Sequence, residues 1–276
     1  KTLGKYTGVP EAGIFGLLYI LEEHDNVCVF LSDWQAMVDI LISSYHVCLE
    51  DLILPWNLMG ILWDVTEEKL SFSSDNMKDD WKQCHKRFRV TLLTIKTPSG
   101  SYHANILLYD FLIHTLERFE PYDIHRAVKP YKLRQQLIQL YTKCDHDFAK
   151  YIEPTHFGFM GTGGLQLLQE NENQMNHKLD PIGFCQPWVF IYAHLRLKHP
   201  NQRPETIPYI IGALTRQHNS SLTTFIRAYS QHLLDHTHTM FTQIILHNLT
   251  EKYKDHRVVV LLMAIKKLIN WQDAQI

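Results

Sequence analysis

The stretch from Leu179 to Trp188, Leu-Asp-Pro-Ile-Gly-Phe-Cys-Gln-Pro-Trp, constrains the fold of this chain more than any other. Asp-Pro and glycine form turns, and Pro187 is tolerated only in the first turn of a helix, where its missing N–H would have had no partner. From Trp188 onward the pattern is helical and almost wholly apolar, which is typical of a buried helix. The stretch therefore predicts a loop that delivers Cys185 to the first turn of a buried helix.

Cys185 has the expected surroundings of a nucleophile. Unpaired backbone N–H groups and the positive end of the helix dipole favour a thiolate, and the same N–H groups can hold a developing oxyanion. A cysteine at a helix start is more often a small buried hydrophobic residue. The interpretation as a nucleophile therefore needs a base, and a group that orients the base, from elsewhere in the chain.

Composition argues against several classes of partner. The formal charge of −2, from 27 basic and 29 acidic side chains, gives no basic field for nucleic acid or an anionic membrane. The longest apolar run, Ala12 to Leu21, is interrupted by two glycines and is too short to span a bilayer; no signal-peptide layout precedes it. The five cysteines are scattered and include no CxxC pair, so we expect no disulfide framework and a reducing, intracellular compartment. Composition leaves the oligomeric state open.

The chain divides into three segments by pattern. Residues 1–88 are expected to form an N-terminal mixed α/β module, and residues 89–200 the core of the protein. Residues 201–276 are expected to form a C-terminal helical region packed on that core. The residues show no internal repeat and no low-complexity tract.

The core segment predicts an α+β fold. Strand-like, β-branched runs near 89–96, 102–109 and 116–120 predict a small antiparallel sheet, followed by an amphipathic helix near 133–143. We expect this sheet to pack on a central helix that carries Cys185. Extra helices are expected near 204–217, 221–247 and 256–271.

The second and third of these strands supply a base and an acid. If they pair as a hairpin centred near Phe111-Leu112, His103 lies directly across from Glu120, with the two Cβ atoms about 4.5–5.5 Å apart on one face. A carboxylate there fixes the imidazole tautomer and keeps it cationic beside a thiolate. A slip of one residue would send the two side chains to opposite faces. The alternatives are a His103 that is simply packed or solvated, and an Arg118 that pairs with Glu120 in a plain surface ion pair.

Three stretches together resemble the adenain-type cysteine peptidases: Tyr102-His-Ala-Asn-Ile-Leu-Leu-Tyr-Asp110, Glu117-Arg-Phe-Glu-Pro121 and Asp180-Pro-Ile-Gly-Phe-Cys-Gln-Pro-Trp188. That superfamily contains the SUMO- and ubiquitin-like-protein proteases and several processing proteases of large DNA viruses. The chain is similar in particular to uncharacterised members from large DNA viruses. The family order is a histidine on a strand, an acid on the next strand, a glutamine, and a cysteine at the start of a buried helix. The resemblance covers about residues 89–200 and implies a papain-like, adenain-like fold.

Carried over residue by residue, the resemblance implies a role for each group of the site. Cys185 matches the nucleophile, His103 the general base and Glu120 the orienting acid. The glutamine whose amide stabilises the oxyanion is placed at Gln166, with Gln169 and Gln174 as alternatives. The chain departs from the family in having no glycine directly after the cysteine, and in a longer and more polar link between the glutamine and the cysteine.

The resemblance implies a cysteine peptidase that cleaves peptide or isopeptide bonds, without a cofactor. Its substrate would be a protein or peptide, either a viral polyprotein or a ubiquitin-like conjugate, and a viral member would act in the host cytoplasm or the virion. The family preference for small residues on the acyl side of the cut implies a narrow tunnel, with Trp188 and the Gly161–Gly164 loop as candidate walls. One alternative is an inactive relative that serves as a structural or virion component. Another is an acetyl transferase with the same triad, which would need a basic inositol-phosphate site that the near-neutral charge does not indicate.

The 17 histidines do not by themselves predict a metal site. His232 and His236 have helical spacing but lack an acid or cysteine ligand on that face, so they are interpreted as residues of a polar face. Cys144-Asp-His146 lacks a second half at zinc spacing. We therefore expect no bound metal.

Overall fold

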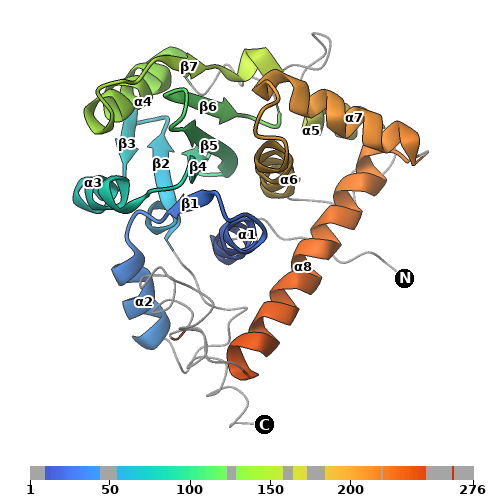
Figure 1. The fold of residues 1–276 in the computed structure, drawn as a ribbon, viewed down its shortest axis with the longest axis horizontal. Helices are drawn as coiled ribbons and strands as arrows, with labels where there is room; N and C mark the ends of the chain where they lie inside the picture. The colour runs from blue at the N-terminus through green and yellow to red at the C-terminus, as the bar shows by residue number, and fades with distance from the viewer. Residues whose placement is uncertain are drawn as a thin grey trace.

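The computed structural model describes residues 10–43, 55–122, 129–157, 164–172, 184–218, 220–246 and 263 (Figure 1). Several sequence-based predictions lie outside these residues: the loop at 179–183, the candidate Gln174, positions 161–163 of the glycine loop and the helix expected near 256–271.

The helices and strands alternate along the chain. In order they are α1 Pro10–Glu23, β1 Val27–Phe30, α2 Trp34–Ser43, η2 Trp56–Leu58, β2 Gly60–Asp64, β3 Lys69–Ser71, α3 Ser74–Gln83, β4 Phe88–Lys96, β5 Tyr102–Asp110, β6 Thr115–Phe119, α4 Pro130–Cys144, β7 Lys150–Ile152, η4 Pro154–Phe157, α5 Leu165–Glu172, α6 Cys185–Lys198, η5 Pro204–Thr206, α7 Ile207–Gln217 and α8 Leu222–Leu246.

The strands form one seven-stranded sheet in the order β3-β2-β4-β5-β6-β7, with β1 also paired to β4. The strands β4, β5 and β6 make the expected antiparallel meander. The sheet is larger and more mixed than expected, because β1 and β2 run parallel to β4 and β7 runs parallel to β6. The strands that precede residue 88 thus share a single sheet with those that follow it, although the sequence pattern divides the chain there.

Helices cover both faces of this sheet, which gives the α+β architecture predicted from sequence (Figure 1). The strand β4 is buried along nearly all its length, which suits its β-branched and apolar sequence. One hydrophobic core joins α1, α6 and α8 to one face of the sheet. A second core joins α3 and α4 to the opposite face. The helix α6 therefore lies between the sheet on one side and other helices on the other.

A close approach between α1 and α6 fixes the position of α6. At Gly16 of α1, a Cβ atom would lie 2.2 Å from the ring of Phe190 in α6. The glycines that interrupt the first apolar run are thus places of close packing, with Gly13 set against Leu92 and Met59. Only a residue without a side chain allows this approach at Gly16.

A buried ion pair fixes the other end of α6 to β6. Arg196 of α6 donates from Nη2 to Glu117 Oε1 at 2.9 Å, and the Tyr192 hydroxyl donates to Glu117 Oε2 at 2.9 Å. Burial raises the pKa of Glu117 to about 7, against the lowering effect of Arg196. Because the loss of one partner would leave a buried charge unpaired, this pair holds α6 in one register on the sheet.

A disulfide joins Cys28 of β1 to Cys84, just after α3, with Cα atoms 6.0 Å apart. The scattered cysteines gave an expectation of no disulfide framework, and this one bond differs from that expectation. The reason lies in the topology: Cys28 is paired in register with Arg89 of β4, and Cys84 lies shortly before that strand begins. The sequence between the two cysteines, which are separated by 56 positions, gives no such signal.

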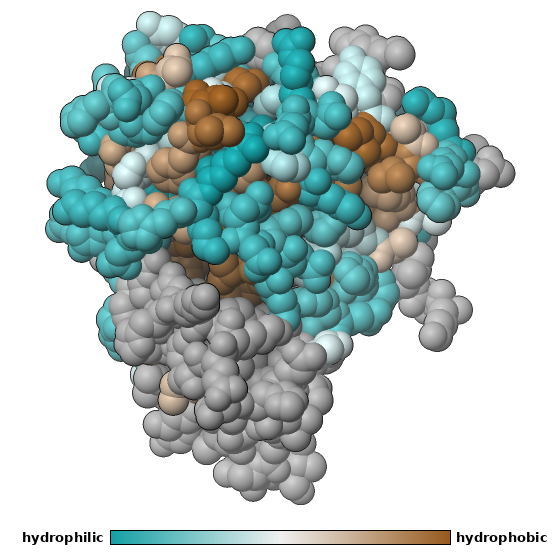
Figure 2. Space-filling model, viewed as in Figure 1, coloured by the Kyte–Doolittle hydropathy of each residue, from teal (hydrophilic) through white to brown (hydrophobic). Residues whose placement is uncertain are grey.

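The surface seen in Figure 2 is mostly hydrophilic, with small hydrophobic patches between polar side chains. Among the described residues, the large hydrophobic side chains that are exposed are those of Tyr102, Leu112, Ile113, Tyr131, Tyr209 and Met263. Within the described residues, no helix has both the length and the apolar character needed to cross a bilayer.

Candidate active site

The helix α6 begins at Cys185, where the sequence pattern places its start. Its first helical hydrogen bond runs from Trp188 N to Phe184 O at 3.0 Å, and Pro187 lies in the first turn. The side chain of Cys185 is nearly buried, with 8% of the residue exposed. Cys185 therefore lies at the N-terminus of a buried helix, near backbone N–H groups that no helical carbonyl can reach.

The Cys185 sulfur also contacts the edge of β5. It accepts a hydrogen bond from the backbone N–H of Ala104. The strand β6 pairs with β5 only from Ile106 to Asp110, so Ala104 lies beyond the end of that pairing. The sulfur is thus positioned by a helix start on one side and by an uncovered strand edge on the other.

His103, next to Ala104 in β5, links the sulfur to a carboxylate. Its ring is hydrogen-bonded to Cys185 and, through Nε2, to Oε1 of Glu120. The His103 side chain remains 22% exposed, whereas that of Glu120 is 2% exposed. The structure therefore brings together the three side chains that the sequence analysis selected, from β5, from the residue after β6 and from the start of α6.

The expected pairing of His103 directly across from Glu120 is wrong by two residues. The observed register pairs Ile106 with Phe119 and Asp110 with Thr115, and its continuation sets Glu120 opposite Asn105. A shift of two residues preserves the alternation of faces, so Glu120 still reaches His103, now as a diagonal neighbour. The shift arises because the hairpin turn occupies residues 111–114 and is centred one residue later than expected.

Glu120 accepts hydrogen bonds on both carboxylate oxygens. Besides His103, Oε1 accepts the backbone N–H of Tyr122 at 3.0 Å, and Oε2 accepts Nδ2 of Asn105 at 2.6 Å. Burial would raise the pKa of Glu120, but the charge and hydrogen bond of His103, the Tyr122 N–H and the charge of Arg118 together lower it. Glu120 is therefore held as a carboxylate despite its burial.

The charges of the site favour a thiolate next to an imidazolium. Burial lowers the pKa of His103, but the Glu120 charge and the hydrogen bonds to Cys185 and Glu120 outweigh it, so the pKa lies well above its usual value. Burial raises the pKa of the Cys185 thiol, but the hydrogen bond and charge of His103 and the Ala104 N–H outweigh it, so the pKa is lowered. A thiolate is the form of cysteine that attacks carbonyl carbon.

Arg118 does not form the surface ion pair considered as an alternative. It is 2% exposed, and no ion pair joins it to Glu120 in the part of the chain that the structure describes. Its charge nevertheless contributes to the low pKa of Glu120. Arg118 therefore acts on the carboxylate from within the protein.

Gln166 lies at the start of α5, close in the fold to the residues that follow Glu120. Its backbone N–H donates to Pro121 O at 2.8 Å, and its Nε2 donates to Glu170 Oε1 at 3.2 Å. Glu170 also binds the Tyr122 hydroxyl. Gln166 is thus joined to the region of the triad through Pro121 and Tyr122, and its role at the oxyanion stays a prediction.

The other residues predicted to belong to the site are placed differently. Gln169 is buried and its backbone oxygen accepts a hydrogen bond from Thr223 at 3.4 Å, which directs this part of α5 toward α8. Trp188 is fully buried at 0% exposure and stacks on Phe225 of α8. It therefore does not line a channel open to solvent in this structure, contrary to the expectation that it walls a substrate tunnel.

Sequence analysis missed Asn105, Tyr122 and Glu170 as neighbours of the site. A signal for Asn105 was present, because a residue two positions from His103 on a strand shares its face. Tyr122 acts through its backbone N–H, and Glu170 comes from a helix that the sequence pattern did not predict. The contact of Tyr122 with Glu120 is local, between residues two apart, whereas that of Glu170 with the Tyr122 hydroxyl follows from the tertiary fold.

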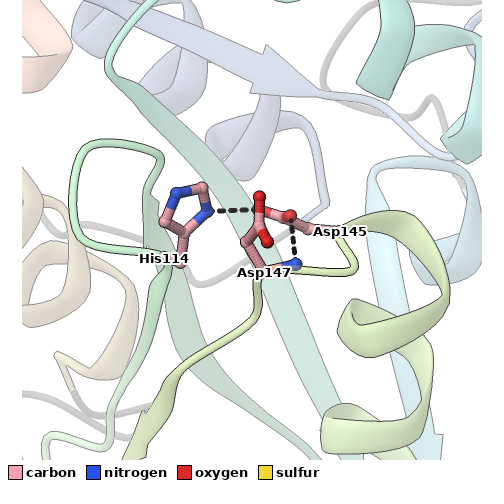
Figure 3. A group of neighbouring side chains, drawn as sticks. All are labelled: His114, Asp145 and Asp147. Carbon is pink, nitrogen blue, oxygen red and sulfur yellow. Dashed lines mark hydrogen bonds and ion pairs between the residues drawn. The ribbon is translucent and has the colours of Figure 1, made fainter.

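One group of potential metal ligands lies away from the triad. The ligand atoms of His114, Asp145 and Asp147 lie within 4.8 Å of one another (Figure 3). Hydrogen bonds within the protein already engage Asp145: His114 Nδ1 lies 2.7 Å from its Oδ2, and the Tyr109 hydroxyl donates to the same oxygen at 2.6 Å. These hydrogen bonds join the turn between β5 and β6 to the end of α4, which explains why the three side chains lie close together.

The histidines of α8 also form contacts that the sequence analysis did not predict. His236 pairs with Glu22 at 3.0 Å, and His232 lies 3.3 Å from the Tyr19 hydroxyl. Both partners belong to α1. The two histidines therefore form polar contacts that help α8 pack on α1.

Comparisons with known proteins give distant likenesses. No protein-family model matches the chain. A protein of Acanthamoeba polyphaga mimivirus, described as an ankyrin repeat protein, is 22% identical over 246 residues, which cover 83% of this chain and 32% of that protein. The chain thus spans about a third of the length of this curated relative.

Two solved structures from Chlamydia trachomatis are similar in part. ChlaDub1 gives a TM-score of 0.40 at 12% identity, covering 84% of this chain and 94% of its own. The effector protein Cdu1, in a structure bound to ubiquitin, gives a TM-score of 0.33 at 13% identity, covering 78% of this chain and 95% of its own.

Proposed function

We propose that this chain is a cysteine peptidase in which Cys185 is the nucleophile, His103 the general base and acid, and Glu120 the orienting carboxylate. The observation that carries the proposal is the hydrogen-bonded series from the Cys185 sulfur through the His103 ring to Glu120. A nucleophile, a base within hydrogen-bond reach and a third group that orients the base are the parts that covalent catalysis by cysteine requires. The low thiol pKa and the position at a helix start support the same role.

The reaction proceeds in two steps on these residues. The Cys185 thiolate attacks the carbonyl carbon of a peptide or isopeptide bond, and the C–N bond breaks as His103 donates its proton to the leaving amine. This step leaves a thioester on Cys185. His103 then takes a proton from water, whose oxygen attacks the thioester and releases the carboxylic acid and the thiolate.

The oxyanion that forms in each step needs hydrogen-bond donors. The backbone N–H groups at the start of α6 are one source, because no preceding helical turn can accept their bonds. The Gln166 amide is the second donor that we propose, after a change of partner from Glu170. Glu120 stays ionised throughout and keeps the His103 ring aligned.

The substrate is proposed to be a protein, either a ubiquitin-like conjugate or a viral polyprotein. This choice rests on the resemblance of the His103, Glu120 and Cys185 stretches to the ubiquitin-like-protein and viral processing proteases. The formal charge of −2 gives no basic field that would indicate a nucleic-acid partner.

The test is covalent labelling of the full chain at neutral pH. Ubiquitin and SUMO probes with an electrophile at the C-terminus, and a peptide library for cleavage, report the two substrate classes. We expect one probe or peptide to react, with the adduct mapped to Cys185. Cys185→Ala should abolish the reaction, and His103→Ala should slow it by about 10²–10⁴-fold.

Cys144→Ser is the matched control, since Cys144 is the other free cysteine among the described residues and lies at the end of α4. It should react like the wild type. Absence of labelling and of cleavage, in a protein whose Cys185 titrates as an ordinary thiol, would contradict the proposal. That result would favour an inactive relative with a structural or virion role.

A further inference from the structure

Asn105 is a buried polar residue beside the candidate site. It lies two positions after His103 in β5, on the same face, and is 0% exposed. Its Nδ2 donates to Glu120 Oε2 at 2.6 Å. This hydrogen bond engages the carboxylate oxygen that His103 does not contact.

Of the two polar atoms of the Asn105 amide, only Nδ2 forms a hydrogen bond among the described residues. Its Oδ1 is buried and has no hydrogen-bond partner among the described residues. A buried acceptor without a partner lowers stability, so the Oδ1 side of the Asn105 amide contributes nothing favourable. The benefit of asparagine at this position is therefore its N–H donor, which acts on Glu120.

The geometry gives this donor a specific effect. With Tyr122 N–H and His103 on Oε1 and Asn105 on Oε2, both oxygens of the Glu120 carboxylate have hydrogen-bond partners. Loss of the bond to Oε2 leaves that oxygen buried without a donor. The carboxylate would then be free to rotate or to take up a proton.

We propose that Asn105 is a positioning residue of the Cys185–His103–Glu120 site, whose side-chain N–H holds the Glu120 carboxylate in the orientation that aligns His103 with the sulfur. The inference rests on the proposed function, because it concerns the same three side chains. Other charged or titratable groups near the carboxylate are Arg118 on β6, Tyr122, and Glu170 on α5. Asn105 differs from them in that its side chain donates directly to the carboxylate.

The test measures the rate at which iodoacetamide alkylates Cys185 between about pH 4 and 9, by mass spectrometry of the full chain after digestion. It needs no substrate. We expect the wild type to stay reactive well below the ordinary thiol pKa of about 8.5. Asn105→Leu should lower the rate near pH 6 by at least about tenfold and move the midpoint toward the ordinary value, as expected from losing a hydrogen bond to a charged group.

Two further variants make the test decisive. Asn105→Ala cannot overpack the site, so it gives the same information if the leucine variant fails to fold. Thr91→Val is the matched control, because Thr91 is a buried residue of β4 that pairs with Leu107 rather than with a residue of the site. It should keep the wild-type profile.

The outcomes separate this inference from the proposed function. If the Asn105 variants fold and keep the wild-type pH profile, Asn105 is a structural residue and the inference is overturned, while the peptidase proposal stands. If the wild-type Cys185 itself titrates as an ordinary thiol, the ion pair does not exist and both proposals fall.

Discussion

At the scale of single residues, Glu120 shows how a buried carboxylate stays charged. Burial alone would favour its protonated form. Donors on both oxygens and the charge of Arg118 reverse that preference. The charge on Glu120 in turn raises the pKa of His103, and His103 lowers the pKa of the Cys185 thiol. The charged forms of Glu120, His103 and Cys185 therefore stabilise one another in sequence.

Gln166 gives a prediction at this scale. If its amide stabilises the oxyanion, Gln166→Ala should lower kcat/KM for a cleaved peptide by about 10²–10³-fold, because one oxyanion donor contributes that much. The rate of alkylation of Cys185 should not change, since the ion pair with His103 remains. Steady-state kinetics and alkylation kinetics on the same variant measure the two effects.

Gln169→Ala is the control for this prediction. Gln169 is also a buried glutamine of α5, but its backbone contact is with Thr223 of α8. Its replacement should change kcat/KM little. A larger loss in Gln169→Ala than in Gln166→Ala would reverse the assignment of the oxyanion donor.

The meeting of Cys185, His103 and Glu120 could be predicted from two local patterns together with the resemblance to the adenain-type cysteine peptidases, which linked the cysteine to the other two residues. A proline in a first turn fixes the start of α6, and alternation along a strand fixes the face of His103. The predicted register of the β5–β6 pair differs from the observed one by two residues. His103 and Glu120 still contact each other, because two residues are one full period of a strand. Alternation also places Asn105 on the face of His103, but its hydrogen bond to Glu120 depends on how the two side chains pack, which the alternation does not specify.

At the scale of elements, the approach of α1 to α6 predicts opposite effects for two glycines. Gly16→Ala places a Cβ 2.2 Å from the ring of Phe190, which is fully buried and cannot move away. Such overpacking costs about 1–3 kcal/mol, more than the roughly 1 kcal/mol that alanine contributes to a helix. Gly16→Ala should therefore lower the Tm, by about 2–4 °C for each kcal/mol of net loss.

Gly13→Ala is the matched comparison in the same helix. Its nearest neighbours, Leu92 Cδ2 at 3.2 Å and Met59 Sδ at 3.3 Å, are the ends of flexible side chains that can shift by a few tenths of an ångström. The helix propensity of alanine should then prevail, and the Tm should stay level or rise slightly. Differential scanning calorimetry measures the Tm of both variants. Equal losses of Tm in Gly13→Ala and Gly16→Ala would show that α1 and α6 do not approach as described.

Elements with strong internal patterns were predicted with nearly correct ends, whereas two short elements, β7 and α5, were missed. The strands β4, β5 and β6 and the helix α6 each carry their own periodicity. Residues 144–184 were expected to be mostly loop, yet they contain β7 and α5. A strand of three residues such as β7 is stabilised by its pairing with β6 rather than by its own sequence.

At the scale of the whole molecule, the sheet depends on contacts between distant parts of the chain. The strands β1 and β2 lie along the first and second halves of β4, both in parallel. Parallel pairing needs a crossover rather than a turn, so no local signal marks it. For this reason the sequence pattern separates residues 1–88 from the strands with which they share a sheet.

The disulfide between Cys28 and Cys84 allows the last prediction, which concerns the stability of the entire fold. It closes a loop with 56 residues of sequence separation between β1 and the end of α3. In the chain-entropy model a loop of this size contributes up to about 4 kcal/mol, by restricting the unfolded chain. Cys84→Ser should therefore lower the Tm by up to about 8–16 °C, and a reducing agent should lower the wild-type Tm equally while leaving the variant unchanged. Cys144→Ser, which removes a free thiol, should keep the wild-type Tm. If thiol titration of the unreduced protein finds both cysteines free, β1 is held in place by its pairing with β4 and not by a disulfide, and neither treatment should change the Tm.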